Sequence, residues 1–171
     1  GYDPVIYLYN YLITGEHPYA ESCIIPDRMV TSRNIKELWD YKTGFIENPI
    51  TSNRLMQPVD SKPGKNLRIA YVEFEDNDFC RQMKSGALEA AKKFKHNNFR
   101  LECVHIFEKA REINPDFKKL EGTSLTEEIW DCGMQRLVTE GYDGIITQAT
   151  SEFMIRVINR AVDKGAVIVT H

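Results

Sequence analysis

The sequence has no long apolar run, since none approaches the roughly 20 residues that a membrane-spanning helix needs. It also has no excess of either charge: 22 basic and 25 acidic residues leave a formal net charge of −3. We therefore expect no nucleic-acid partner for this segment, because phosphate backbones are bound by clustered positive charge. The 42% apolar and 27% charged residues are typical of a globular domain, and 171 residues suffice for one hydrophobic core.

Metal and redox motifs are also missing. No CxxC pair occurs, and neither the cysteines nor the histidines have the spacing of zinc ligands. We expect no metal site, and we expect the cysteines to be free thiols that pack as small apolar side chains. Free thiols favour a reducing compartment, although spacing alone leaves disulfides open. The residues concerned are Cys23, Cys80, Cys103 and Cys132, with His17, His96, His105 and His171.

Residues 67–171 alternate strand-like and helix-like patterns. Helical spacing of apolar residues predicts helices over about 79–94, 125–140 and 152–164, and Ser124 with Glu127 makes a capping box for the second. Thr150 or Ser151 is expected to cap the third helix. Short apolar segments predict the strands: Leu67–Phe74, Arg100–Phe107, Asp143–Thr147 and Ala166–Thr170. This order predicts an α/β fold, a doubly wound parallel sheet of flavodoxin-like type with the strand from Leu67 innermost.

The first 66 residues do not continue this alternation of strand-like and helix-like patterns. Asp3 and Pro4 are expected to open a helix that ends at Gly15, with an apolar stripe and further short elements beyond it. Residues 41–66 are rich in Pro, Gly, Ser and Asn and predict a linker. The stripe is Val5, Leu8, Tyr9 and Leu12, and the further elements are a strand at Ser22–Ile25 and a short helix at Asn34–Trp39.

Enzyme motifs of parallel-sheet families are absent from the loops. The segment after the first predicted strand reads EFEDND, four acids without the glycines that let backbone approach a pyrophosphate, and no P-loop occurs. No GxSxG elbow is present. A receiver domain would need an aspartate where this chain has Gln148. We therefore expect no cofactor and no catalysis, with an enzyme on a flavodoxin-like sheet kept as a minor alternative.

Doubly wound sheets bind ligands beyond the carboxyl ends of their strands. This rule indicates the loops Glu73–Asp78 and Gln148–Glu152. Asn and Gln supply donors and acceptors together, and carboxylates accept bonds from hydroxyls, so these loops suit a small polar ligand. The alternative is a solvated helix start, because acids at a helix N-terminus are favourable through the dipole, and Phe79 would then belong to the core.

Residues 67–94 (LRIAYVEFEDNDFCRQMKSGALEAAKKF) resemble the opening of type I periplasmic sugar-binding proteins and of LacI-type effector domains. The resemblance lies in a strand, a loop with Asn and aromatic residues, and a helix with a Gly-Ala pair, here Gly86 and Ala87. It implies that Asn77, Phe79 and Cys80 contact the ligand. Cys80 departs from the family, which often has a second aromatic residue there.

Residues 142–171 (YDGIITQATSEFMIRVINRAVDKGAVIVTH) are similar to a later part of the same family. The resemblance implies that Gln148 stands at a ligand-contacting position and that the last strand ends in a polar contact, here His171. Together with the loop chemistry, it predicts a ligand site formed by these residues: Glu75, Asn77, Phe79, Cys80, Gln148 and His171.

The first unit resembles the end of such proteins rather than their beginning. Residues 1–40 are similar to the family's closing segment, and residues 67–171 to its N-terminal-type lobe. Two tandem modules or a circular permutation would both give this inverted order. The sequence begins at Gly1 inside a predicted helix, which we interpret as a segment of a longer protein.

The resemblance implies that the chain holds a small polar, sugar-like ligand within a solute-binding or sensor protein. Expected partners are the second lobe of the same protein and an ABC transporter or a sensor kinase, with a homodimer as a further candidate. This function favours an extracytoplasmic or membrane-associated sensor location. The alternative is the effector-sensing domain of a LacI-type transcription regulator, which would be cytoplasmic.

Overall fold

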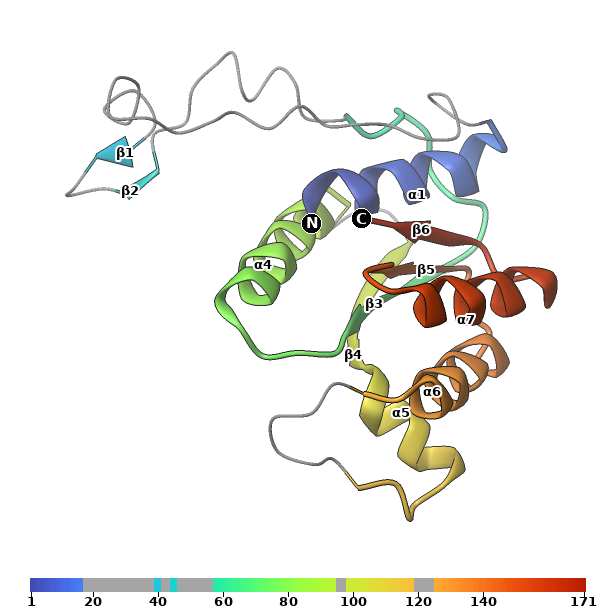
Figure 1. Cartoon of the computed structure of the whole chain (residues 1–171). Coiled ribbons are helices and arrows are strands. Elements are labelled where there is room, and N and C mark those ends of the chain that lie inside the picture. The colour runs from blue at the N-terminus through green and yellow to red at the C-terminus, as the bar shows by residue number, and fades with distance from the viewer. Residues whose placement is uncertain (17–38, 41–43, 46–56, 95–97, 119–124) are drawn as a thin grey trace.

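A computed structural model describes residues 1–16, 39–40, 44–45, 57–94, 98–118 and 125–171 of the chain. Its centre is a sheet of four parallel strands in the order β4-β3-β5-β6 (Figure 1). The strands are β3 (Leu67–Glu73), β4 (Phe99–His105), β5 (Gly144–Thr147) and β6 (Ile168–Thr170). The predicted α/β parallel fold is confirmed, and β3 is an inner strand that pairs with both β4 and β5.

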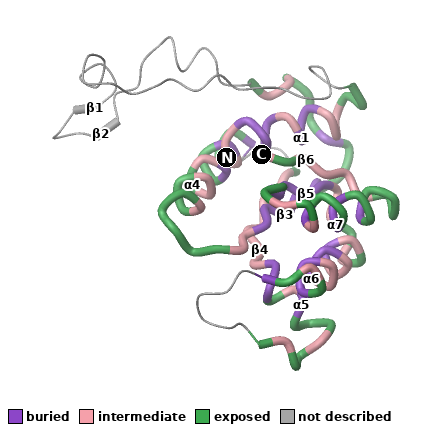
Figure 2. The backbone as a smooth tube through the Cα atoms, viewed as in Figure 1, coloured by how far each residue is buried: buried purple, intermediate pink, exposed green. Residues whose placement is uncertain are grey.

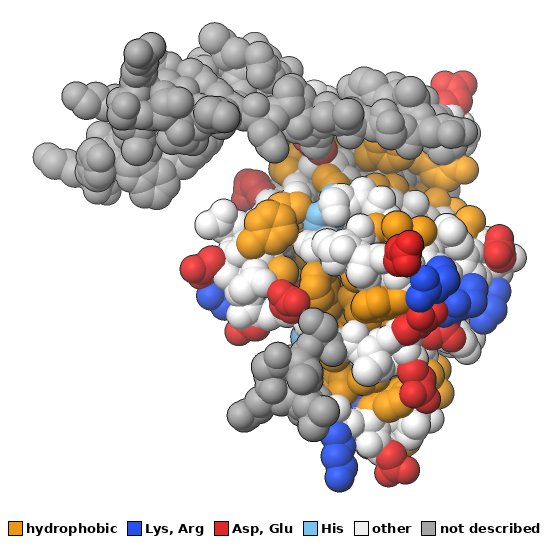
Figure 3. All heavy atoms as spheres, viewed as in Figure 1, with side chains coloured by type: hydrophobic (Ala, Val, Ile, Leu, Met, Phe, Trp, Pro, Cys, Tyr) orange, Lys and Arg blue, Asp and Glu red, His pale blue; other side chains and the backbone are white. Residues whose placement is uncertain are grey.

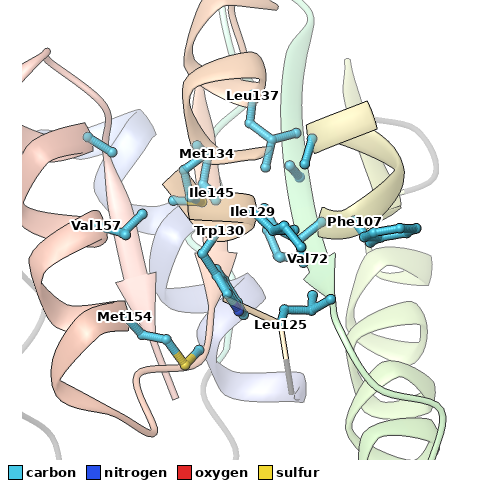
Figure 4. Close-up of a cluster of buried hydrophobic side chains, with 14 residues drawn as sticks. Val72, Phe107, Leu125, Ile129, Trp130, Met134, Leu137, Ile145, Met154 and Val157 are labelled. Carbon is cyan, nitrogen blue, oxygen red and sulfur yellow. The ribbon is translucent and has the colours of Figure 1, made fainter. Parts of the chain in front are cut away.

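Helices cover both faces of the sheet. The helices α1 (Tyr2–Thr14) and α4 (Asp78–Lys92) lie on one face, and α5 (Ile106–Ile113), α6 (Glu127–Thr139) and α7 (Glu152–Asp163) on the other (Figure 1). Each face has its own buried cluster, and the tube view shows the burial concentrated where helices meet the sheet (Figure 2). Trp130 and Met134 of α6 lie in one cluster with Ile145 of β5 (Figure 4).

The predicted stripe of α1 packs on the sheet beside α4. Val5, Leu8 and Tyr9 are fully buried, and Leu12 lies partly buried against the same cluster. Two glycines allow the close approach. A Cβ on Gly144 would lie 2.7 Å from Leu8 Cδ2, and a Cβ on Gly86 would lie 3.1 Å from the backbone nitrogen of Tyr2.

The segment before β3 is tied to α1 through side chains. Asn10 Nδ2 donates to the Gln57 carbonyl at 3.0 Å, and Asn10 Oδ1 accepts from the Val59 amide at 2.9 Å. The Tyr9 hydroxyl donates to the Ser61 carbonyl at 2.7 Å. The end of the predicted linker therefore runs along α1.

The helix caps partly differ from the sequence-based expectation. Asp3 does not cap α1, because the helix begins one residue earlier, at Tyr2, and its N-cap position is Gly1. The cap of α6 is Thr126, whose hydroxyl accepts from the Ile129 amide, and Ser124 lies outside the described residues. Ser151 caps α7 as expected.

The helix α5 was not predicted. The strand expected to reach Phe107 ends at His105, and α5 starts at the next residue. His105 Nδ1 accepts from the Phe107 amide and marks this start. Ile106, Phe107 and Ala110 are buried on one side of α5, so apolar residues that suggested a strand pack instead at helical spacing.

Between α1 and β3 the structure describes one antiparallel pair of two-residue strands, β1 (Trp39–Asp40) and β2 (Gly44–Phe45). Trp39 therefore lies in a strand rather than in the expected short helix. The rest of that helix and the strand at Ser22–Ile25 lie outside the described residues. In the described part of the chain, no helix combines the length and apolar character needed to cross a membrane.

Candidate functional site

The strand order places the two predicted loops at one edge of the sheet. From β3 the chain crosses through α4 to β4 on one side, whereas β5 pairs with the other side of β3. The direction of winding thus reverses between β3 and β5, and a topological switch point in a parallel sheet opens a crevice at the carboxyl ends of its strands. The loops after Glu73 and after Thr147 flank this point.

The loop after β3 is ordered by Asn77. Its Oδ1 accepts from the Cys80 amide at 2.8 Å and caps α4, and its Nδ2 donates to Glu75 Oε2 at 2.8 Å. Both ends of the Asn77 amide therefore have partners within the chain. Its clearest role is to hold the loop and the first turn of α4 in place.

Two cations of α4 hold most of the acids in this region. Lys84 Nζ lies 2.8 Å and 2.9 Å from the two carboxylate oxygens of Glu73. Arg81 pairs with Asp76 and with Asp78. The interactions with Glu73 raise the pKa of the Lys84 ammonium. Space-filling shows charged and apolar side chains side by side on this face (Figure 3).

The ring of Phe79 is not part of the core. It is 60% exposed at the start of α4, in contrast to the buried apolar residues later in that helix. This exposure removes the interpretation of Phe79 as core and leaves its ring available as a stacking surface. The neighbouring Cys80 is half-buried, and burial raises the pKa of its thiol, so the thiolate is disfavoured.

Gln148 is a polar residue that lies almost completely buried at the end of a strand. It directly follows β5 and is only 6% exposed. Its side-chain amide makes no hydrogen bond to the described residues, and it is not among their fully buried unpaired groups, so the amide reaches solvent at this edge of the sheet. A group of this kind, at the switch point of the sheet, is suited to hold a polar ligand or water.

His171 follows β6 at the same edge. Its backbone amide donates to the Thr147 carbonyl at 3.2 Å, and its ring stacks on Tyr71 with 5.7 Å between centroids and a 12° interplanar angle. Its Nε2 is buried and has no partner among the described residues. Burial lowers the pKa of the imidazole to about 4, so it is neutral at pH 7.

Tyr71 is a candidate that sequence analysis missed. It is 3% exposed and lies in the middle of β3, where an aromatic residue among Ile, Ala and Val reads as core. Its place in the sheet relates it to the predicted residues, because Tyr71 is in register with Ile146 of β5, and Ile146 is in register with Val169 of β6. Side chains two residues apart share a face of the sheet, so Tyr71, Gln148 and His171 lie on the face that α1 and α4 cover.

The predicted residues therefore form two groups at the carboxyl edge of the sheet. Gln148 and His171 join Tyr71 in a buried group on the sheet itself. The other group is exposed or half-buried and lies on the loop after β3 and the first turn of α4. It consists of Glu75, Asn77, Phe79 and Cys80.

Among the described residues, no group of three or more His, Cys, Asp or Glu side chains is arranged to hold a metal ion. Comparisons with protein-family models, curated proteins and solved structures find no match to this chain. The functional argument therefore depends on the chemistry of the site itself.

Proposed function

We propose that the chain binds a small polar, sugar-like ligand at the carboxyl edge of its sheet, as one lobe of a type I periplasmic-binding-protein-like module. The observation that carries this proposal is the position of Gln148 at the topological switch point, where the residue is only 6% exposed and its amide reaches solvent without a hydrogen bond to the described residues. The donors and the acceptor of this amide are therefore free to bond a ligand in the crevice.

The surroundings of Gln148 support a polar ligand with an apolar face. Tyr71 and His171 place a hydroxyl and an imidazole nitrogen on the same face of the sheet, and Phe79 exposes a ring at the rim. Sugars combine hydroxyl groups with weakly polar C–H faces that stack on aromatic rings. Hydroxyl groups both donate and accept hydrogen bonds, as the amide of Gln148 does.

The packing of α1 supports the lobe interpretation. The helix lies beside α4 on the sheet, with Val5 and Leu8 fully buried, as expected for the family's closing segment. In such a module a second lobe supplies the other wall of the site. On this proposal the whole protein delivers or reports its ligand to a transporter or a sensor, and an effector-sensing domain of a transcription regulator would use the same site.

Amide NMR titration tests the proposal, because it detects millimolar as well as tight binding. Monosaccharides and polyols are added to about 50 mM, the range expected of weak sites. We expect shifts in the backbone signals of residues 74–80 and 148–151. Gln148→Leu should abolish these shifts, whereas the matched variant Gln135→Leu, whose parent amide pairs with Asp131 on α6, should retain them. Absence of any shift at the sheet edge with the whole panel contradicts the proposal.

A further inference from the structure

We infer that His171 contacts the ligand through its Nδ1–H group, as a hydrogen-bond donor, and that the enclosure of its other ring nitrogen fixes this tautomer. The inference rests on the proposed function and deepens it. It names the atom of the chain that binds and the class of ligand atom that it takes, a hydroxyl or carbonyl oxygen with a free lone pair.

The two nitrogens of the His171 ring have different surroundings. Among the described residues, Nε2 is the one fully buried side-chain nitrogen or oxygen without a hydrogen bond. Nδ1 makes no hydrogen bond to the described residues either, but it is not among their fully buried unpaired atoms, so it reaches solvent. One nitrogen of the ring is therefore enclosed by the protein, and the other is accessible at the carboxyl edge of the sheet.

This difference selects one tautomer of the neutral ring. Burial, and to a smaller extent the charge of the Gly1 ammonium, lower the pKa of the imidazole to about 4, so the ring carries a single proton at pH 7. A proton on Nε2 would be a buried N–H group without an acceptor, which is rare in proteins. A proton on Nδ1 can instead be shared with water or with a ligand. We therefore expect Nδ1 to be the donor.

The strand register places this donor beside Gln148. Thr147 of β5 is in register with Thr170 of β6, and the His171 amide donates to the Thr147 carbonyl at 3.2 Å. Gln148 and His171 are the next residues of the two chains, so their side chains are neighbours on one face of the sheet. A ligand hydroxyl can accept from His171 Nδ1 and donate to the side-chain oxygen of Gln148, and this combination suits the hydroxyl groups of a sugar.

The tautomer is measured on the unaltered chain without ligand. NMR correlation of the imidazole nitrogens with the carbon-bound ring protons distinguishes the two neutral tautomers, and the signals of His171 are those lost in His171→Asn. At pH 7 we expect a protonated Nδ1 and an unprotonated Nε2. A protonated Nε2, alone or as half or more of an exchanging population, overturns the inference whatever the sugar titrations show.

Two variants of matched shape test the contact with the ligand. The amide nitrogen of asparagine can stand close to the position of Nδ1, so His171→Asn retains a donor there and should bind glucose or galactose about as well as the unaltered chain. His171→Leu has the same branching without polar atoms. It should weaken the sugar about three- to tenfold, the range of one neutral hydrogen bond. Amide NMR titrations give the affinities, and the amide spectra show that each variant is folded.

The outcomes separate this inference from the proposed function. Equal affinity of His171→Asn and His171→Leu overturns the donor role of His171, while binding by the unaltered chain still supports the site. An Nε2–H tautomer likewise overturns the inference and leaves the function in place. Failure of both glucose and galactose, with the rest of the panel, to shift any signal at the sheet edge overturns the proposed function and the contact together.

Discussion

At the scale of single residues, Gln148 is the one on which the binding account depends most. Its side chain is largely buried, its amide reaches solvent without a hydrogen bond to the described residues, and leucine has a similar volume without polar atoms. We expect Gln148→Leu to change the free energy of unfolding by less than about 1 kcal/mol, while sugar binding is lost. Urea unfolding of the two proteins measures the difference. A loss of more than about 2 kcal/mol would show that the amide has a structural partner, contrary to its assignment as a ligand group.

His171 predicts a dependence of stability on pH. The folded-state pKa of about 4 lies below the ordinary value of 6.5 for a histidine side chain, so the unfolded chain binds a proton first as the pH falls. The free energy of unfolding should therefore decrease between about pH 6.5 and pH 4, at less than the limiting 1.4 kcal/mol per pH unit because the ring is only partly buried.

Comparison with His171→Gln isolates this effect from the other titrating groups. Urea midpoints at pH 7 and pH 5 should differ more in the unaltered chain than in the variant. Glu102, Glu112 and Glu127 have pKa values lowered by their cation partners, and their contribution is the same in both proteins, so the comparison removes it. Equal pH dependence of the two proteins would show that the imidazole is hydrated rather than buried.

At the scale of elements, α5 and α6 meet at Gly133. A Cβ there would lie 2.6 Å from the Ile106 carbonyl oxygen and 2.7 Å from the Ile106 side chain. We expect Gly133→Ala to destabilise the protein by about 1–3 kcal/mol, although alanine favours helices, because the two helices must move apart. Thermal unfolding measures the loss. Gly64→Ala is the control, since no described residue lies within 4 Å of its Cβ position, and it should leave the melting temperature nearly unchanged.

The packing of α1 gives a second prediction for an element. Leu8 is fully buried and its side chain lies over Gly144 of β5. Leu8→Ala should cost about 2–5 kcal/mol, the range for a large buried residue cut to alanine. Leu88→Ala, at a 42% exposed position of α4, should cost far less. Similar midpoints of urea unfolding for both variants would show that α1 is not integral to the sheet domain.

Sequence patterns predicted the elements whose signals are local. Apolar runs located β3 and β5, and Ser151 correctly marked the start of α7. They failed at α5, because Ile106 and Phe107 continue the apolar character of β4, and the start of the helix is marked by the bond that His105 Nδ1 accepts from the Phe107 amide. They also missed Tyr71, since its partners come from strands far away in the sequence. Burial without a hydrogen bond, which among the described residues distinguishes Nε2 of His171, is a property of tertiary structure alone.

At the scale of the whole molecule, the structure shows one parallel sheet with both faces covered. On the lobe interpretation, a ligand held by this edge alone leaves much of its surface in water, whereas complete pockets bury about 70–90% of a ligand. We therefore predict that calorimetry against monosaccharides and polyols shows weak or undetectable heat. Micromolar or tighter binding by the monomer would show that the chain is a complete binding unit and that the lobe assignment is wrong.

The most direct test of the central claim is where the chain's amide signals shift during titration with the neutral sugars. The account predicts shifts that cluster at residues 74–80, 148–151 and His171, at the carboxyl edge of the sheet, and that are lost in Gln148→Leu. Shifts confined to the opposite edge, around Arg68, Glu102 and Tyr142, would contradict it.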